Sequence, residues 1–164
     1  MKAVVVPQVN GPWELREIPT PRPAAGQVLI RVHASGICHN DVWLTNGAFP
    51  FPPIDPVVLG HEPAGEVVDV GPGVTSRQVG DRVGATWMQG TCGRCGYCRR
   101  NLPMTGQAAI SCQAPVMTGI TAQGGHAEYI AVAACSTVLL PDNVTYEAAA
   151  PMLCAGYTAW CAAS

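Results

Sequence analysis

The chain has 164 residues, of which 48% are hydrophobic and only 12% are charged, so its composition is that of a folded protein with a buried core. Its net charge is −2 at pH 7 and it contains no basic run, which argues against nucleic acid or an anionic membrane as the main partner and favours small molecules. The apolar N-terminal run is too short for a signal peptide, and no stretch of about 18 apolar residues is present, so we expect a cytoplasmic location. Eight cysteines in a reducing compartment favour metal ligands and buried thiols over disulfides.

Short apolar segments separated by glycine and proline predict a β-rich fold. Taken in chain order, the expected strands lie at 3–6, 13–18, 28–33, 64–70, 82–86, 127–132 and 138–140. Helix is expected only late in the chain, as an N-capped turn at 145–150 and an alanine-rich stretch at 154–163. Because no long helix separates any two strands, this order predicts an antiparallel barrel or sandwich.

The densest group of metal-ligand residues is a run of three cysteines, Cys92, Cys95 and Cys98, with two residues between neighbours. Thiolates at this spacing converge on one tetrahedral Zn²⁺, and the intervening glycines permit the positive φ angles that such a turn needs. Disulfides are the alternative, but neighbouring cysteines in such a run pair poorly with one another. The run therefore predicts a zinc site.

A second set of ligand residues is spread over three segments of the chain, at Cys38, His61 and Cys154. Two thiolates and one imidazole form a zinc ligand set that leaves a fourth position open to water or substrate, as in catalytic sites. The alternative is that both cysteines are small buried residues and that His61 is a hydrogen-bonded structural histidine. Spacing alone does not decide between the two.

Several motifs point to one family. The sequence Gly-His-Glu-Pro-Ala-Gly occupies 60–65 and is followed by Gly71 and Val74. Further landmarks stand at 36–39, 79–83, 92–98, 124–129 and 154–158. In this order they resemble the zinc-containing alcohol dehydrogenases of the medium-chain dehydrogenase/reductase family, and the resemblance covers essentially the whole chain.

The resemblance implies a mainly β fold, the partly open GroES-like β-barrel with a zinc lobe and short helices. Residues 1–153 would form this catalytic domain, and residues 154–164 would begin the helix that leads to a Rossmann domain, which binds NAD or NADP in the full-length parent. No Gly-x-Gly-x-x-Gly fingerprint occurs in the chain. We therefore expect a truncated oxidoreductase that lacks its Rossmann domain and is inactive alone.

The same resemblance implies residue roles. Cys38, His61 and Cys154 match the catalytic zinc ligands, where the metal lowers the pKa of a bound alcohol before hydride passes to the nicotinamide. Glu62 matches a carboxylate that also approaches the metal, and Asp41 matches the acid that orients the ligating histidine. His39 and Thr158 match positions that meet the pyrophosphate and the nicotinamide half of the cofactor. Phe49 and Trp87 match aromatic walls of the substrate pocket, although core packing is an equal alternative for each.

Asn40 departs from the family, which usually has Ser or Thr at this catalytic position. A hydroxyl accepts one proton while it passes on another, whereas an amide offers no such path, so water or His39 would have to relay the proton. We therefore expect that a simple alcohol is not the favoured substrate.

The cysteine run matches the family's structural zinc lobe, but its fourth cysteine departs from the usual spacing. Family spacing after Cys98 leads to position 106, which is Gly106. We expect an insertion within 102–111 that returns Cys112 to the metal, because added loop residues cost little closure entropy. A lobe with three thiolates or without metal is the alternative. Cys135 and Cys161 are expected to be buried thiols, and His33 and His126 structural histidines.

Two kinds of function remain open at this point. The first is the catalytic-domain portion of an enzyme that converts an alcohol to an aldehyde or ketone with NAD(P), including relatives that act on polyols, formaldehyde or aryl alcohols. The second is a zinc-stabilised GroES-like binding or assembly module without enzymatic activity, which works with another chain or as a homo-oligomer.

Overall fold

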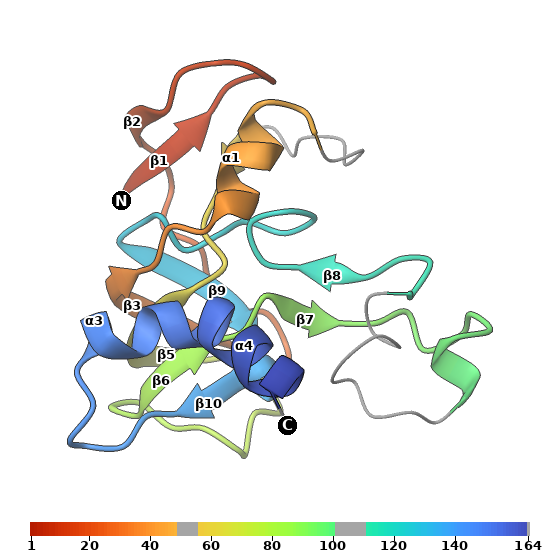
Figure 1. The fold of residues 1–164 in the computed structure, drawn as a ribbon. Coiled ribbons are helices and arrows are strands. Elements are labelled where there is room, and N and C mark those ends of the chain that lie inside the picture. The colour runs from red at the N-terminus through yellow and green to blue at the C-terminus, as the bar shows by residue number, and fades with distance from the viewer. Residues whose placement is uncertain (49–55, 101–110, 164) are drawn as a thin grey trace.

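The computed structural model describes residues 1–48, 56–100 and 111–163, and strands make up most of its regular structure (Figure 1). The strands are β1 (Lys2–Val6), β2 (Glu14–Glu17), β3 (Gln27–Ser35), β4 (Val57–Val58), β5 (Pro63–Val70), β6 (Arg82–Ala85), β7 (Met88–Gly90), β8 (Val116–Met117), β9 (Tyr129–Ala133) and β10 (Thr137–Leu139). The helices are α1 (His39–Thr45), α3 (Tyr146–Ala149) and α4 (Ala155–Ala163), with short 3₁₀ helices η1 (Cys98–Arg100), η2 (Ala134–Ser136) and η3 (Ala150–Leu153).

The central layer is a five-stranded antiparallel sheet in the order β10-β6-β5-β3-β9. A three-stranded sheet, β2-β1-β4, and the two-stranded sheet β7-β8 complete the strands, and no closed barrel forms among the residues that the structure describes. The mainly β fold predicted from the sequence is confirmed.

Aliphatic side chains form the core against one face of the five-stranded sheet. Val28 and Ile30 of β3, Val67 of β5, and Ile130 and Val132 of β9 are each at most 2% exposed. Residues two apart in a strand point to the same face, which is why alternate positions of β3 and β9 fill this core. Burial of each such side chain stabilises the folded state by about 1.5–3 kcal/mol. The strands β3 and β5 therefore hold the segments at their ends in fixed positions.

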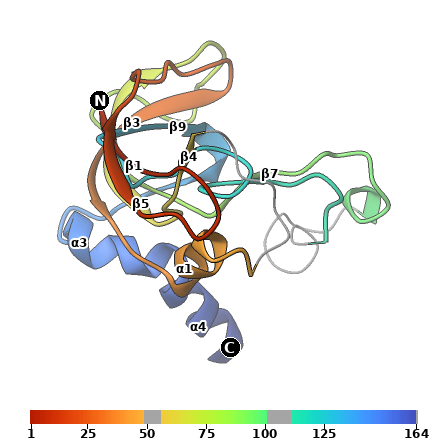
Figure 2. The same ribbon diagram turned by 90° about the horizontal axis from the view of Figure 1, so that it is seen from above.

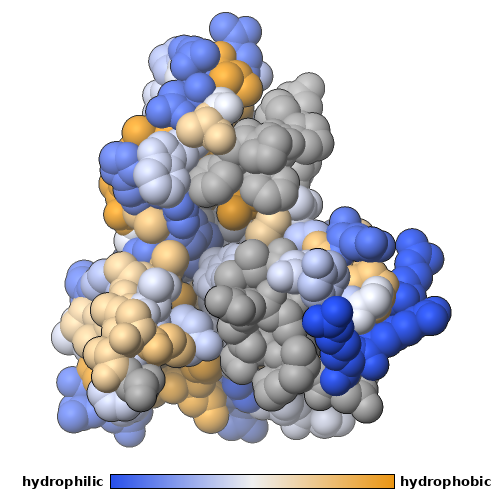
Figure 3. Space-filling model, turned by 45° about the vertical axis from the view of Figure 1, so that its right-hand side comes forward, coloured by the Kyte–Doolittle hydropathy of each residue, from blue (hydrophilic) through white to orange (hydrophobic). Residues whose placement is uncertain are grey.

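The strands β7 and β8 lead into a lobe that projects from the body of the molecule and carries the cysteine run (Figures 1 and 2). Strongly hydrophilic residues gather on the outer face of this lobe (Figure 3), where Arg94, Arg99 and Arg100 are exposed. Gln89 in β7 anchors the base of the lobe: its Nε2 donates to Thr118 Oγ1 at 3.2 Å, and its Oε1 accepts from a backbone N–H of β9 at 3.3 Å.

All seven strands predicted from the sequence are present, with ends within two residues of the prediction. The late helices are also confirmed, and the Thr145 side chain accepts from the Ala148 N–H as an N-cap does. The prediction missed β4, β7, β8 and α1. The expectation that Cys135 and Cys161 are buried is wrong, because both are exposed. Within the described ranges, no helix is long and apolar enough to cross a membrane.

Candidate metal centres

The pairing of β3 with β5 builds the first centre. Ser35 at the end of β3 pairs with Pro63 at the start of β5, and the N–H of Gly36 donates to the Glu62 carbonyl at 3.2 Å. The segment after β3, which contains Cys38 and α1, therefore lies beside the segment before β5, which contains His61 and Glu62.

Cys154 joins this centre from the other end of the chain. It lies between η3 and α4, directly after Leu153, which is buried in a cluster with Ala64 of β5. The potential ligand atoms of Cys38, His61, Glu62 and Cys154 all lie within 4.8 Å of one another. The residues that the sequence reading grouped are thus brought together by the fold.

The two ring nitrogens of His61 have different surroundings. The ring is 1% exposed, and Nδ1 lies 3.2 Å from the Oδ1 atom of Asp41. Nε2 is buried and has no hydrogen-bond partner in the described part of the chain. A buried ring nitrogen without a partner is costly unless something else binds it, and a ring nitrogen of His61 lies within 4.8 Å of ligand atoms of Cys38, Glu62 and Cys154. This donor set fits Zn²⁺.

Asp41 has a double role in the local structure. It is the third residue of α1, and its Oδ2 accepts from the Cys38 N–H at 2.9 Å, which caps the start of the helix. Burial alone would raise the pKa of Asp41, but the neighbouring rings of His126 and His61 and the hydrogen bond from the Cys38 N–H outweigh burial and hold the pKa well below its usual value. Asp41 therefore stays a carboxylate inside the protein.

The pKa values of Glu62 and Cys154 are raised, whereas that of Asp41 is lowered. Burial raises the pKa of Glu62, which is 2% exposed, although the nearby His61 partly offsets this. Burial, and after it the charge of Cys38, raises the pKa of Cys154 to about 12. In the metal-free protein the two anionic forms are thus penalised, as expected for a cluster of ligands that share one cation.

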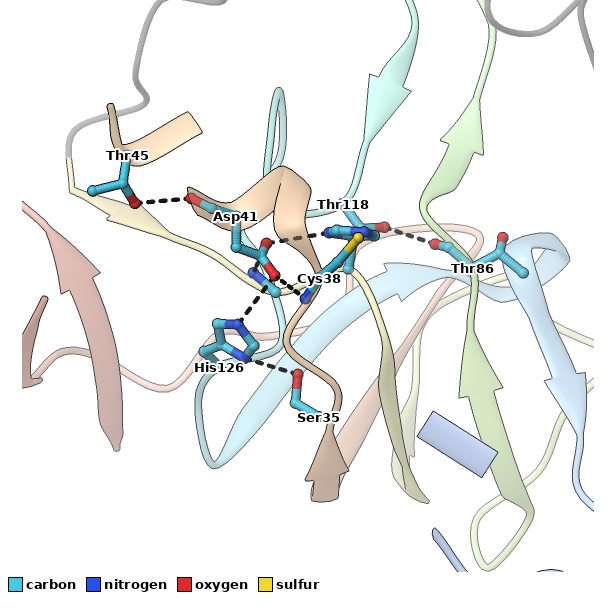
Figure 4. A network of polar contacts seen from close by, with 9 residues as sticks. Ser35, Cys38, Asp41, Thr45, Thr86, Thr118 and His126 are labelled. Carbon is cyan, nitrogen blue, oxygen red and sulfur yellow. Dashed lines mark hydrogen bonds and ion pairs between the residues drawn. The ribbon is translucent and has the colours of Figure 1, made fainter. Parts of the chain in front are cut away.

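His126 is a neighbour of this centre that the sequence reading missed. Its Nδ1 lies 2.9 Å from Ser35 Oγ, and its Nε2 lies 3.6 Å from Asp41 Oδ2 (Figure 4). The expectation of a hydrogen-bonded structural histidine accounts for the contact with Ser35 but not for the contact with Asp41. No pattern in the sequence signals the Asp41 side, because the two residues come from distant segments that only the fold brings together.

The cysteine run forms the second centre, in the projecting lobe. The Sγ atoms of Cys92, Cys95, Cys98 and Cys112 all lie within 4.8 Å of one another, and Cys112 Sγ is 3.6 Å from Cys98 Sγ. Hydrogen bonds from the backbone N–H groups of Gln113 and Cys98 lower the pKa of Cys95 to about 6. The fourth cysteine expected from the sequence is thus beside the other three.

The remaining predicted site residues lie on several elements of the fold. His39 and Asn40 open α1, where the ring of His39 lies edge-on to Trp43 at 4.9 Å, and Thr158 is exposed on α4. Trp87 is partly buried and packs beside the buried pair Met88 and Met117. Phe49 lies outside the described residues.

Curated proteins that are similar to this chain are named alcohol dehydrogenases. An alcohol dehydrogenase from Geobacillus stearothermophilus is 42% identical over 160 residues, which cover 98% of this chain and 46% of the relative. An alcohol dehydrogenase from Schizosaccharomyces pombe is 37% identical over 153 residues, which cover 92% of this chain and 42% of the relative. The chain therefore spans less than half the length of these relatives.

Solved structures agree. A crystal structure of an NAD-dependent alcohol dehydrogenase matches with a TM-score of 0.86 at 31% identity, over 98% of this chain and 45% of that one. A cobalt- and zinc-bound thermostable alcohol dehydrogenase from Pyrobaculum aerophilum matches with a TM-score of 0.81 at 33% identity, over 98% of this chain and 46% of that one. Residues 24–142 also match the family described as the alcohol dehydrogenase GroES-like domain. The chain therefore belongs to the alcohol dehydrogenase GroES-like domain family.

Proposed function

We propose that this chain is the catalytic-domain portion of a zinc-dependent alcohol dehydrogenase and that Cys38, His61 and Cys154 hold the catalytic zinc, with Glu62 close enough to approach it. One observation carries the proposal: Nε2 of His61 is buried without a hydrogen-bond partner in the described ranges, and the ring belongs to a group of ligand atoms, with two thiols and a carboxylate, that lie within 4.8 Å of one another. The names of the relatives favour this function over an assembly module without activity.

Zinc bound at this centre would supply Lewis acidity, which lowers the pKa of an alcohol substrate near neutral pH. The chain's own residues prepare the centre for that role. Asp41 holds the proton of His61 on Nδ1, which leaves the Nε2 lone pair free for the metal. Three protein ligands would leave one coordination position for substrate, and Glu62 would offer an oxygen as the fourth donor when that position is empty.

We propose a second, structural zinc in the lobe, held by Cys92, Cys95, Cys98 and Cys112. Four thiolates close the coordination sphere, so this site performs no chemistry. The distances among the four Sγ atoms support the set. Such a site contributes folding energy to a small lobe whose own hydrophobic cluster, Met88 and Met117, is limited.

The hydride acceptor is proposed to be NAD or NADP, bound mainly outside this domain in the full-length enzyme. Residues 1–153 would be the catalytic domain and 154–164 the start of the helix that leads to the cofactor domain. The exposed α4, in which no residue is buried, supports this division. His39 and Thr158 would then meet the cofactor from the catalytic side.

The substrate is proposed to be a small alcohol or the corresponding aldehyde or ketone, other than the simplest alcohols. Asn40, half-buried in the first turn of α1, offers an amide where a hydroxyl would relay a proton. In the enzyme that contains this domain, Asn40→Thr should raise turnover of primary alcohols. Unchanged turnover would remove the reason for this substrate assignment.

Zinc analysis combined with NADH titration tests the proposed function. We expect two zinc ions per wild-type chain, one per Cys38→Ser chain, and two for the control Cys135→Ser, which changes an exposed thiol outside both clusters. We expect the 164-residue chain alone to bind NADH only weakly. An unchanged zinc content in Cys38→Ser would overturn the assignment of the catalytic site.

A further inference from the structure

His126 is the second histidine that faces the buried carboxylate of Asp41 (Figure 4). Its Nε2 lies 3.6 Å from Oδ2, whereas Nδ1 of His61 lies 3.2 Å from Oδ1, so each carboxylate oxygen faces one ring. The His126 side chain is 7% exposed and Asp41 is fully buried. Nε2 of His126 has no hydrogen-bond partner among the described residues, and the Asp41 carboxylate is the charged group it faces.

The backbone holds His126 in this place from both sides. Its N–H donates to the Leu59 carbonyl at 2.9 Å, and its own carbonyl accepts from the Val4 N–H at 2.7 Å. Gly60, directly before His61, has φ +94°, and a Cβ at this position would lie 2.6 Å from Nδ1 of His126. The chain next to His61 is therefore shaped to admit the second ring.

The ring environment assigns the proton on His126. Ser35 Oγ lies 2.9 Å from Nδ1, and when the hydroxyl donates to Nδ1 the proton of the neutral ring is on Nε2, which faces Asp41. The opposite tautomer would point a nitrogen lone pair at a carboxylate, which is electrostatically unfavourable. Trp13 lies against the ring with a centroid distance of 5.9 Å. His126 is therefore oriented as a donor toward Asp41.

We propose that His126 is a positioning residue: the 3.6 Å contact of its Nε2–H with Oδ2 of Asp41 adds to the Cys38 N–H bond to the same oxygen and helps to keep Oδ1 directed at Nδ1 of His61. The carboxylate is then clamped between two histidines, and its rotation about the Cβ–Cγ bond is restricted. The proposal rests on the proposed function, because the clamp matters for chemistry only when Nε2 of His61 binds a metal. Partners of metal-bound histidines set ring orientation and ligand strength, so loss of the clamp should weaken metal binding.

Cobalt(II) titration of the metal-free protein tests this effect through the thiolate-to-cobalt absorption, with Cys38→Ser as the blank for the lobe. His126→Phe keeps a ring but removes the donor, and should weaken binding at the Cys38 centre about tenfold with a shifted spectrum. His126→Gln retains an N–H and should restore most of the affinity. His33→Phe is the matched control, because His33 is exposed and stacks on Tyr146 at 4.5 Å, and its affinity should equal that of wild type.

A His126→Phe protein with wild-type affinity and spectrum would overturn the clamp and leave His126 as a packing residue. If this variant does not fold, Ser35→Ala tests the clamp instead, because it removes the hydroxyl that orients the His126 ring. A loss of cobalt affinity in Ser35→Ala supports the clamp, and unchanged affinity overturns it.

A double-mutant cycle in the metal-free protein separates this proposal from the proposed function. His126→Phe and Asp41→Asn should be coupled by about fivefold or more in the unfolding equilibrium constant, because each removes the other's partner. Additive effects would overturn the clamp whether or not metal binds. Conversely, a wild-type protein without cobalt–thiolate absorption beyond the Cys38→Ser blank would contradict the proposed function, while the cycle still tests the contact.

Discussion

A Cβ atom at Gly36 would overlap the Oε2 atom of Glu62, so the lack of a side chain at position 36 is what allows this buried carboxylate to lie beside Cys38, His61 and Cys154. The pairing of β3 with β5 places these two residues side by side, because Gly36 directly follows β3 and Glu62 directly precedes β5. The Gly36 N–H donates to the Glu62 carbonyl. A glycine in the backbone thus determines the position of an ionisable group in the centre.

Replacement of Gly36 by alanine should therefore displace Glu62. We expect Gly36→Ala to lower the free energy of unfolding by about 1–3 kcal/mol, as overpacking of a buried site does. Gly90→Ala is the matched control, because a Cβ at position 90 meets nothing within 4 Å. Urea denaturation of both variants provides the comparison, and equal stability of the two would show that Glu62 does not need this space.

Loss of the Asp41 carboxylate should weaken the metal centre. Asp41→Asn keeps the volume of the side chain but removes the charge that holds the proton on Nδ1 of His61, and metal affinity should fall about 10–100-fold. Asp142→Asn is the control, since Asp142 is fully exposed. Competition with a chelator of known affinity measures both proteins, and equal values would mean that Asp41 serves only to cap α1.

Cys112 should be required for zinc in the lobe. Its Sγ lies 3.6 Å from that of Cys98, whereas position 106 carries no thiol at all. We expect Cys112→Ser to lose one zinc per chain and to be less stable, because the metal contributes folding energy. A Cys112→Ser protein with its full zinc content would mean that the other three thiolates suffice.

Zinc binding at the first centre should release protons at neutral pH. Burial, and after it the charge of Cys38, raises the pKa of Cys154 to about 12, so this thiol is protonated in the metal-free protein. Zinc binds the thiolate, so protons compete with the metal, and the apparent affinity rises with pH below that pKa. Calorimetry in buffers of different ionisation enthalpy counts the protons, and Cys154→Ser should release about one fewer. The same count in both proteins would contradict Cys154 as a ligand.

Local patterns predicted the strands well because alternation and β-branched residues are local signals. β3 and β9 fill the core from every second position, and this period is visible in the sequence. The short β4 has no such period. Helix α1 was missed because its cap is unusual: the N-cap is Cys38, and the carboxylate of Asp41 satisfies the first N–H.

The proposed metal ligands could be named from the sequence only through resemblance, because Cys38, His61 and Cys154 come from segments that meet through sheet pairing and the packing of η3. The Cys92 run needed no such help, since its spacing is itself the signal. His126 could not be assigned to the centre, because its approach to Asp41 depends on backbone bonds to Leu59 and Val4 in two other segments.

The central claim is that Cys38, His61 and Cys154 share one zinc ion through Nε2 of the histidine. Diffraction from zinc-loaded crystals above and below the zinc absorption edge measures this most directly, because the anomalous difference locates the metal. We predict a peak about 2.3 Å from the Sγ atoms of Cys38 and Cys154 and about 2.0–2.1 Å from Nε2 of His61. The absence of a peak at these three atoms in crystals whose lobe carries zinc, or a zinc bound to Nδ1, would contradict the account.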